Sequence, residues 1–395
     1  MQKYKKPLVG LMLILLVFGF GFVFGKGKAQ EDLESKLEVY LQVLSLVKNN
    51  YVEKNVDNTN IVYGSIRGLL DSLDDPYSRF MEPKDYKEMQ VRLRGSYNGI
   101  GIYIGMKDKQ LMVISPIKGT PAHKMGLKSK DRIATIDGKP TRDMALEQAV
   151  SLIRGPRGTK VKLGILRGDA KDPKDYAIVR DKIEIKSTEY KMIGDSIAYI
   201  KLNTFEKKDS PKEVKAAIDA AKKKGAKGLI VDVRNNGGGL LDNAIDIGSM
   251  FIKKGAIVQT VDREGMRDVQ YSNGQFIWDR PLVVLVNGAS ASASEILAGA
   301  LRDNHVAPLV GAKTFGKASV QSVRVLQDGS AVLLTIAKYL TPSGEDISKK
   351  GIEPDYAIEL PTEEADALLN GDDAKDIQLQ KAIDVLKEKI RGSIG

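Results

Sequence analysis

The chain of 395 residues has no cysteine, so it forms neither a disulfide nor a cysteine–histidine metal cluster. It therefore has no need of an oxidising compartment. Histidine is nearly absent as well, with His123 and His305 as its two occurrences. Histidine is the usual base for a nucleophilic hydroxyl, and a neutral lysine is an alternative. The length suits two or three domains.

The positive charge of the chain is moderate and dispersed. There are 61 basic and 51 acidic residues, which gives a net charge of +10. The lysines usually stand beside acidic residues, as on an ordinary solvated surface. No basic stretch is interleaved with aromatic residues, so we do not expect nucleic-acid binding. The net charge fits some attraction to an anionic membrane surface.

One long apolar segment lies near the N-terminus. Residues 7–25 form an uncharged run of 19 residues, preceded by three lysines and rich in leucine, valine, isoleucine and phenylalanine. This is close to the length that spans a bilayer, and no clear small-x-small cleavage site follows it. We expect an uncleaved signal-anchor rather than a cleaved signal peptide. The basic flank predicts a cytoplasmic N-terminus with the rest outside, although Lys26 and Lys28 weaken that bias.

Two helices are expected after this segment. In residues 31–52 the apolar side chains recur at three- and four-residue steps, which predicts an amphipathic helix. Residues 61–73 form a second helix, ended by Asp74-Asp75-Pro76. Two interpretations remain open, because the pair is either a dimerisation arm or a helical hairpin packed on its own core.

The stretch 281–317 is the most informative part of the chain. Leu282–Val286 is a short apolar run between Pro281 and Asn287-Gly288, which predicts a buried strand. The Ala- and Leu-rich run Ser294–Leu301 predicts a helix. The turn between strand and helix contains three serines: Ser290, Ser292 and Ser294.

These residue types suit acyl transfer by an activated serine. The free N–H groups at a helix N-terminus favour developing negative charge. A second apolar strand, residues 308–311, leads into a loop with Lys313 and Lys317. For either lysine to act as a base, desolvation must lower its pKa from ~10.4 to roughly 7–8. Lys317 has small, apolar neighbours, and composition alone makes an equivalent case for Lys313. A plain capping role for Ser294 remains open.

From about residue 187 strands and helices alternate, which predicts a largely parallel α/β core. Ser210-Pro211-Lys212-Glu213 has the pattern of a capping box, so a helix is expected to begin there. The predicted strand 228–233 is followed by a glycine-rich turn, residues 234–239. Its backbone N–H groups can hold an oxyanion, or the glycines serve only a tight strand–helix turn.

Residues 95 to about 170 resemble a PDZ domain. The resemblance rests on Gly99-Ile100-Gly101-Ile102, then on residues 126–133, and then on Ile136-Asp137-Gly138. A glycine-rich turn that opens a strand offers N–H groups to a peptide's terminal carboxylate, while the peptide adds to the strand edge. We therefore expect peptide binding by four residues: Gly99, Ile100, Gly101 and Ile102.

The run GASASASEI, followed by GAKTFGKASVQ, resembles the signature of the carboxyl-terminal processing proteases, also called tail-specific proteases. Residues 75–81 resemble a motif that precedes the PDZ domain in that family. The resemblance implies Ser292 as nucleophile, Lys317 as general base and Gln321 as support for the lysine. It implies oxyanion donors at the N–H groups of Gly238 and Ala293. It implies no metal or nucleotide cofactor. Gly237 departs from the family, which commonly has proline there.

The resemblance covers most of the chain beyond the apolar run. It implies an α/β fold, with a parallel βα core of the crotonase and Clp-protease type, an inserted and mostly β PDZ domain, and helical N- and C-terminal segments. The expected domains are a cytoplasmic stub with a transmembrane helix (1–28), a helical segment (29–90), the PDZ domain (91–170), the protease core (171–360) and a C-terminal helical segment (361–395).

The sequence thus predicts a serine endopeptidase that captures protein C-terminal tails through its PDZ domain and cleaves by a serine–lysine dyad. It would be anchored by a single pass in the cytoplasmic (inner) membrane, with its catalytic part on the periplasmic side, and a homodimer through the terminal helices is a hypothesis. One rival is a catalytically silent PDZ scaffold in the cell envelope, although intact Ser292 and Lys317 argue against it. The other is a crotonase-type enzyme for acyl thioesters, against which the export signal and the PDZ domain argue.

Overall fold

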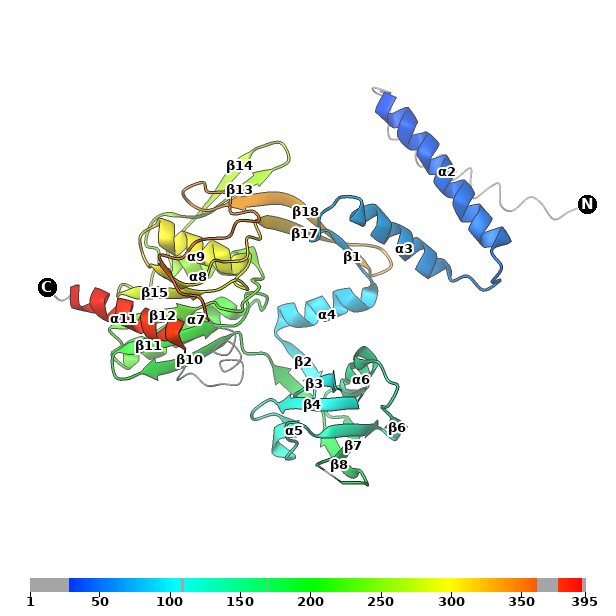
Figure 1. Ribbon diagram of the computed structural model, residues 1–395, viewed down its shortest axis with the longest axis horizontal. Coiled ribbons are helices and arrows are strands. Elements are labelled where there is room, and N and C mark those ends of the chain that lie inside the picture. Colours follow the sequence, from blue (N-terminus) through cyan, green and yellow to red (C-terminus); the bar gives the residue numbers. More distant parts are fainter. Residues whose placement is uncertain (1–27, 108–109, 169, 361–375, 393–395) are drawn as a thin grey trace, which may run out of the picture. The chain divides into compact units, whose positions relative to one another are not determined.

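The computed structural model of the protein describes residues 28–107, 110–168, 170–360 and 376–392. The chain divides after Gly68 into two units. The first contains α2 (Lys28–Asn50) and most of α3 (Asn58–Asp71), which confirms the two expected helices (Figure 1). The apolar run 7–25 lies outside the described residues. No helix within the described ranges is long and apolar enough to cross a membrane.

The α2 helix leaves much of its apolar surface exposed. Leu33 is 61% exposed, Leu41 51% and Leu46 58%. Side-chain hydrogen bonds connect α2 with α3: the hydroxyl of Tyr40 donates to Oγ of Ser65 at 2.9 Å, and Nζ of Lys48 donates to Oδ1 of Asn58. The two helices therefore do not bury these leucines against each other.

The second unit is built on a six-stranded sheet with the order β10-β11-β12-β15-β16-β19. The strands are β10 (Thr188–Ile193), β11 (Ile197–Leu202), β12 (Gly228–Asp232), β15 (Leu282–Val286), β16 (Leu309–Gly311) and β19 (Tyr356–Ala357). β10 pairs antiparallel with β11, and every other pair in this sheet is parallel. The expected largely parallel α/β core is confirmed.

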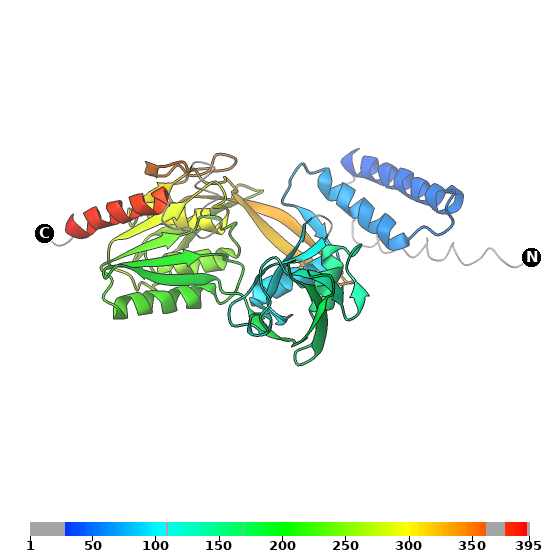
Figure 2. The same ribbon diagram turned by 60° about the horizontal axis from the view of Figure 1, so that its bottom comes forward.

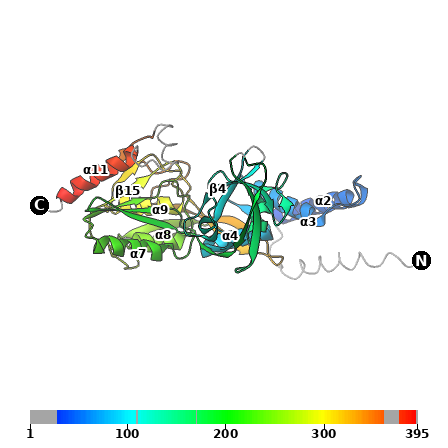
Figure 3. The same ribbon diagram turned by 90° about the horizontal axis from the view of Figure 1, so that it is seen from below.

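Helices cover both faces of this sheet, which explains why its central strands are continuous apolar runs. Four helices pack in this region: α7 (Ser210–Lys223), α8 (Leu241–Ser249), α9 (Ala293–Asp303) and α11 (Ile377–Gly392). Successive strand residues point to opposite faces. Ala198 and Ile200 of β11 belong to the cluster that contains α7, α8 and α9, whereas Ile197 and Tyr199 pack with α11. Figure 3 shows α11 on one side of the strands and α7 and α8 on the other.

A second sheet has the order β1-β18-β13-β14. Its strands are β1 (Arg79–Met81), β18 (Ala331–Leu340), β13 (Ala256–Asp262) and β14 (Arg267–Tyr271). β17 (Ser319–Val325) pairs antiparallel with β18 and forms with it the long hairpin visible in Figure 2. β1 comes from far upstream in the sequence and pairs with β18 at residues 331–333. The segment before the stretch that resembles a PDZ domain is therefore part of the α/β core.

The PDZ domain is inserted between β1 and β10. Helix α4 (Pro83–Arg94) leads into β2 (Ser96–Gly99), and β2 pairs with β9 (Asp181–Glu184), the last strand of the insertion. Between them lie β3 (Ile102–Lys107), β4 (Gln110–Pro116), α5 (Pro121–Lys124), β5 (Arg132–Ile136), β6 (Lys139–Pro140), α6 (Leu146–Ile153), β7 (Lys160–Leu166) and β8 (Lys174–Val179). The insertion has its own apolar core, which includes Ile100, Val113 and Leu163.

The capping box predicted at Ser210 is wrong, although α7 begins at the predicted residue. The hydroxyl of Ser210 donates to the carbonyl of Thr204 instead of capping the helix. The carboxylate of Glu213 accepts from the backbone N–H of Ser187 at 2.9 Å and pairs with Lys207. Both side chains thus bind partners outside the first turn of α7: Ser210 binds the turn just upstream, and Glu213 binds Lys207 and the more distant Ser187.

Candidate active site

The three serines between β15 and α9 have different surroundings. Ser290 and Ser294 are fully buried. The hydroxyl of Ser290 donates to the carbonyl of Val233, and that of Ser294 to the carbonyl of Asn236, each at 2.8 Å. Ser292 is half-buried and lines a cavity of about 430 Å³. Of the three hydroxyl groups, that of Ser292 is accessible to a ligand in this cavity.

Ser292 holds a strained backbone conformation at the N-terminus of α9. Its φ is 55° and its ψ −116°, a region that residues with a Cβ rarely adopt. Such strain costs about 1–3 kcal/mol and persists where the surroundings enforce it. A strand, a sharp turn and a helix that present a strained serine are the arrangement of several hydrolase nucleophiles.

Lys317 lines the same cavity from the loop between β16 and β17. Gly316 precedes it with φ 88°, and a Cβ there would lie 2.8 Å from the backbone nitrogen of Gly351. Only glycine fits this close approach, so the turn that presents Lys317 depends on it. Burial lowers the pKa of the Lys317 ammonium, and the charge of Arg79 lowers it further, whereas Asp75 and Glu295 raise it.

Lys313, the other candidate base, is excluded by its position. Its ammonium pairs with the carboxylate of Glu353 at 2.6 Å, and half of its side chain is exposed. These surroundings do not desolvate the ammonium, and desolvation is what a lysine base requires. Composition could not separate the two lysines, but burial does.

Glu295 connects the serine and the lysine, and sequence reasoning did not find it. The side chain is fully buried. One carboxylate oxygen accepts from the backbone N–H of Ser292 at 2.8 Å and of Lys317 at 2.9 Å. The other accepts from Gly316 N–H and Thr314 Oγ1, each at 2.6 Å. Burial raises the pKa of Glu295, and these four donors oppose the rise.

Tyr339 of β18 complements this carboxylate. Its buried hydroxyl lies 3.2 Å from the carbonyl oxygen of Ser292 and also hydrogen bonds with the carbonyl oxygen of Lys317. Glu295 thus binds the N–H groups of the two residues and Tyr339 binds their carbonyl groups. The two backbone segments are fixed relative to each other by side chains that leave the functional atoms free.

The oxyanion donors predicted from the resemblance differ in availability. The N–H of Ala293 forms no hydrogen bond within the part of the chain that the structure describes. The N–H of Gly238 donates to Oδ1 of Asn236 at 2.9 Å. The backbone of Gly238 lies against the serine turn, because a Cβ there would be 2.8 Å from the nitrogen of Ala293. Gly238 thus lies beside the serine turn, and its N–H is engaged by Asn236 in this structure.

Gln321 lies in the cavity but does not contact Lys317 by a hydrogen bond. Its amide nitrogen donates to Oγ of Ser319 at 2.8 Å and to Oγ1 of Thr335 at 3.4 Å. Among the described residues no cluster of three acidic or histidine side chains is arranged to hold a metal ion.

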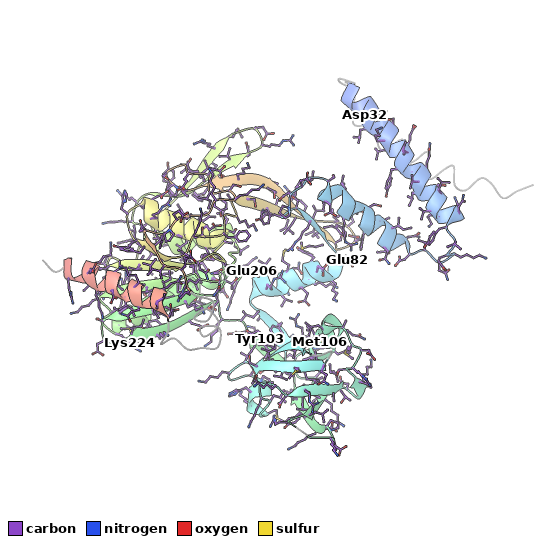
Figure 4. The ribbon with its side chains drawn as sticks, viewed as in Figure 1. Asp32, Glu82, Tyr103, Met106, Glu206 and Lys224 are labelled. Carbon is purple, nitrogen blue, oxygen red and sulfur yellow. The ribbon has the colours of Figure 1, made fainter. Side chains whose placement is uncertain are left out.

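The four predicted peptide-binding residues line a separate groove of the PDZ domain. Gly99, Ile100, Gly101 and Ile102 border a cavity of about 1010 Å³ together with Val150 and Ile153 of α6. β3 is the edge strand of its sheet, and Tyr103 and Met106 on it are exposed (Figure 4). Ile100 itself is 1% exposed and belongs to the apolar core of the domain, so its side chain does not reach the surface of the groove.

Models of known protein families match most of the chain. The model of peptidase family S41 matches residues 196–358, that of the PDZ domain residues 89–166, and that of the activating protease CtpB N-terminal domain residues 23–85. The first of these ranges contains the serine turn, the lysine loop and the glycine turn.

The similar proteins agree with these matches. The chain is 40% identical over 347 residues to the carboxyl-terminal-processing protease of Synechocystis sp., across 86% of this chain and 80% of that protein. It is also 40% identical to the carboxy-terminal processing protease CtpA of Bacillus subtilis, across 83% and 70%. The solved photosystem II D1 C-terminal processing protease is 32% identical with a TM-score of 0.50, across 82% of this chain and 92% of that one.

Proposed function

The chain belongs to the carboxyl-terminal processing proteases of peptidase family S41, and from that premise we propose that Ser292 is its nucleophile and Lys317 its general base. It is a serine protease that carries a PDZ domain. One observation supports the assignment above all. Ser292, unlike the two other serines of its turn, shares a cavity with a lysine whose protonated form is disfavoured by burial.

In the proposed reaction Oγ of Ser292 attacks the carbonyl carbon of the scissile peptide bond, and Nζ of Lys317 takes the hydroxyl proton. The tetrahedral intermediate then collapses, the carbon–nitrogen bond breaks, and Lys317 gives its proton to the leaving amine. Water attacks the resulting ester while Lys317 accepts a proton again. Release of the new carboxylate restores Ser292.

Two backbone N–H groups are proposed to stabilise the oxyanion. The N–H of Ala293 supports this role because it lies at the start of α9 and has no hydrogen-bond partner among the described residues. The N–H of Gly238 joins it once the hydrogen bond to Asn236 is exchanged for one to the oxyanion. In this proposal the glycine turn changes its hydrogen bonding as the intermediate forms. Gln321, which lines the same cavity, is proposed to orient Lys317.

The PDZ groove is proposed to hold the C-terminal tail of a protein substrate. The free edge of β3 supports β-strand addition, and the turn at Gly99–Ile102 offers backbone donors to a terminal carboxylate. Cleavage then occurs in the separate cavity that contains Ser292. Substrates of this kind are proteins or peptides with accessible C-termini.

The dyad is tested by labelling the full-length protein with a fluorophosphonate, which is attacked by an activated serine with loss of fluoride. We expect labelling in the wild type and in Lys313→Ala, and a loss of at least about a thousandfold in Ser292→Ala and Lys317→Ala. Circular dichroism checks that each variant is folded. Equal labelling of wild type and Lys317→Ala would contradict the assignment of the base.

We also propose that residues 7–25 anchor the protein in the cytoplasmic membrane, with the protease on the periplasmic side. The length of the run and the lysines before it support this orientation. Resistance of the protein to carbonate extraction, together with digestion by an externally added protease after outer-membrane permeabilisation, is the expected result. Full release by carbonate would contradict the anchor.

The exposed leucines of α2 support a homodimer through the terminal helices. A contiguous exposed apolar surface marks a site of protein association. Analytical ultracentrifugation of the wild type and of a variant with Leu33→Ser, Leu37→Ser and Leu41→Ser tests this, with a dimer expected only for the wild type. A monomeric wild type would contradict the proposal.

A further inference from the structure

The segment Asp75–Arg79, just before and at the start of β1, lies against the lysine of the active site. The ring centroid of Tyr77 is 4.7 Å from Nζ of Lys317. Arg79 lines the same cavity as Lys317 and Ser292. The segment is therefore close to the reacting groups, although it is separated from them in sequence by the whole PDZ domain.

Hydrogen bonds hold this segment to β18 without help from Lys317. The carboxylate of Asp75 accepts from the hydroxyl of Ser78 at 2.6 Å and from the backbone N–H of Tyr77 at 3.1 Å. The hydroxyl of Ser78, 5% exposed, accepts in turn from the backbone N–H of Thr335 at 3.0 Å. β1 then continues as a strand paired with β18. The position of the Tyr77 ring is thus set by the core.

We propose that this segment belongs to the active site: the ring of Tyr77 covers the amine of Lys317 against water, and the guanidinium of Arg79 repels its protonated form. The proposal rests on the assignment of Lys317 as the general base. Tyr77 and Arg79 act through Lys317 and are positioning residues, because neither is needed to touch the reacting atoms.

The groups that face Lys317 come from several elements. Asp75, Tyr77 and Arg79 lie on the segment, Glu295 on α9 and Tyr339 on β18. Burial is the largest influence and lowers the pKa of Lys317; Arg79 also lowers it, and Asp75 and Glu295 raise it. Contact with an aromatic face favours the ammonium. Desolvation of a lysine moves its pKa by up to about 3–5 units, which outweighs a single ring contact.

The test is the pH dependence of Ser292 labelling by a fluorophosphonate in the full-length protein. The midpoint of this profile reports the pKa of the base. In Tyr77→Ala we expect the midpoint to rise by about one unit, so that labelling falls about tenfold at neutral pH and recovers at alkaline pH. Tyr77→Phe keeps the ring and should keep the wild-type midpoint.

Charge variants give shifts of opposite sign. Arg79→Gln should raise the midpoint, by less than Tyr77→Ala because Arg79 is exposed and screened by solvent, and Arg79→Lys should restore it. Asp75→Asn should lower the midpoint. Arg92→Gln is the matched control, because Arg92 also lines the cavity but pairs with Glu206 at 3.1 Å, and it should leave the midpoint in place.

Wild-type midpoints in both Tyr77→Ala and Arg79→Gln would overturn the inference, whatever their labelling rates. Arg79→Gln changes an exposed side chain and keeps the test decisive if Tyr77→Ala does not fold. Labelling of the wild type that does not depend on Lys317 would instead refute the assignment of the base. The two failures are therefore distinguishable in one series of measurements.

Discussion

Glu295 is a buried carboxylate that accepts four hydrogen bonds, three from backbone N–H groups and one from a hydroxyl. Backbone N–H groups take the place of a counter-ion, as they do at a helix N-terminus. Since two of these groups belong to Ser292 and Lys317, the same interaction stabilises the fold and sets the distance between the two residues. An amide at this position cannot reproduce it, because its nitrogen accepts no hydrogen bond.

We therefore predict that Glu295→Gln lowers the free energy of unfolding by about 2–3 kcal/mol and slows labelling of Ser292. Urea unfolding and the fluorophosphonate reaction measure the two effects. Glu345→Gln is the control, because Glu345 forms a half-exposed surface pair with Arg302. Unchanged stability and labelling in Glu295→Gln would show that the carboxylate is not needed.

The pH dependence of stability gives a second readout for Glu295. Its pKa is raised in the folded state, so between the ordinary value and the raised value the folded protein binds a proton that the unfolded chain has lost. Stability from this group is consequently greatest at low pH and falls as pH rises through that window. The difference in unfolding free energy between wild type and Glu295→Gln should follow this fall, and a flat difference would contradict it.

For single residues, composition and local pattern predicted which residue types the site contains, but not which serine and which lysine belong to it. Composition offered three serines and two lysines; the resemblance to the processing proteases pointed to Ser292 and Lys317, and burial and hydrogen-bond partners support the same two residues. Glu295 was visible only as the residue after Ser294, because its partners Thr314 and Gly316 come from another loop. No local pattern reports such a contact, nor the engagement of the Gly238 N–H by Asn236.

At the level of elements, α11 is attached to the glycine turn through Arg234. Its guanidinium forms a bidentate pair with Asp376, at 2.9 and 2.7 Å, directly before α11. It also pairs with Asp232 at the end of β12 at 2.7 Å. All three side chains are at most 9% exposed. Arg234 is the first residue of the turn that contains Gly238, so the C-terminal helix helps to fix this glycine-rich turn.

Asp376→Ala should therefore cost about 3–5 kcal/mol of stability, because it leaves a buried guanidinium incompletely paired. The start of α11 should also loosen, which amide hydrogen exchange detects. Asp384→Ala, on the exposed side of the same helix, should change stability by less than about 0.5 kcal/mol. Equal changes in stability for the two substitutions would show that the Arg234–Asp376 pair stabilises the fold no more than an exposed side chain of α11 does.

Elements with a strong local pattern were predicted well. β15 has the predicted bounds, and α7 begins at the predicted serine, because apolar periodicity and proline placement act locally. The capping box failed because Glu213 binds Ser187 and Lys207 instead. The pairing of β1 with β18 was not predicted, because a three-residue strand contains no pattern that indicates its pairing partner, and β18 follows the PDZ domain in the sequence.

For the molecule as a whole, the proposed sites of tail capture and of peptide cleavage are separate cavities, so the two activities should be separable by mutation. Gly101 has φ 78°, and a Cβ there would lie 2.4 Å from Cβ of Thr120 in the peptide groove. Gly101→Ala should weaken binding of a peptide with a free apolar C-terminus by about tenfold or more. Labelling of Ser292 by a small fluorophosphonate should remain.

Gly138→Ala is the matched control for this experiment. Gly138 also has φ 78° and lies in the PDZ domain, but the space around its Cβ position is open. It bears the same backbone strain without blocking the groove, so peptide affinity measured by fluorescence anisotropy should stay near wild type. Equal loss of affinity in both variants would mean that backbone strain, and not the groove, is responsible.

The PDZ domain leaves and rejoins the core at one place. The carbonyl of Gly95 accepts from the N–H of Ile185 at 2.9 Å, next to the paired strands β2 and β9. The two ends of the insertion are thus one hydrogen bond apart, like the base of a hairpin. A tight turn in place of residues 96–184 would close the core without stretching it. The recognition module is in this sense exchangeable, and a different binding domain with adjacent termini could redirect the same protease to new substrates.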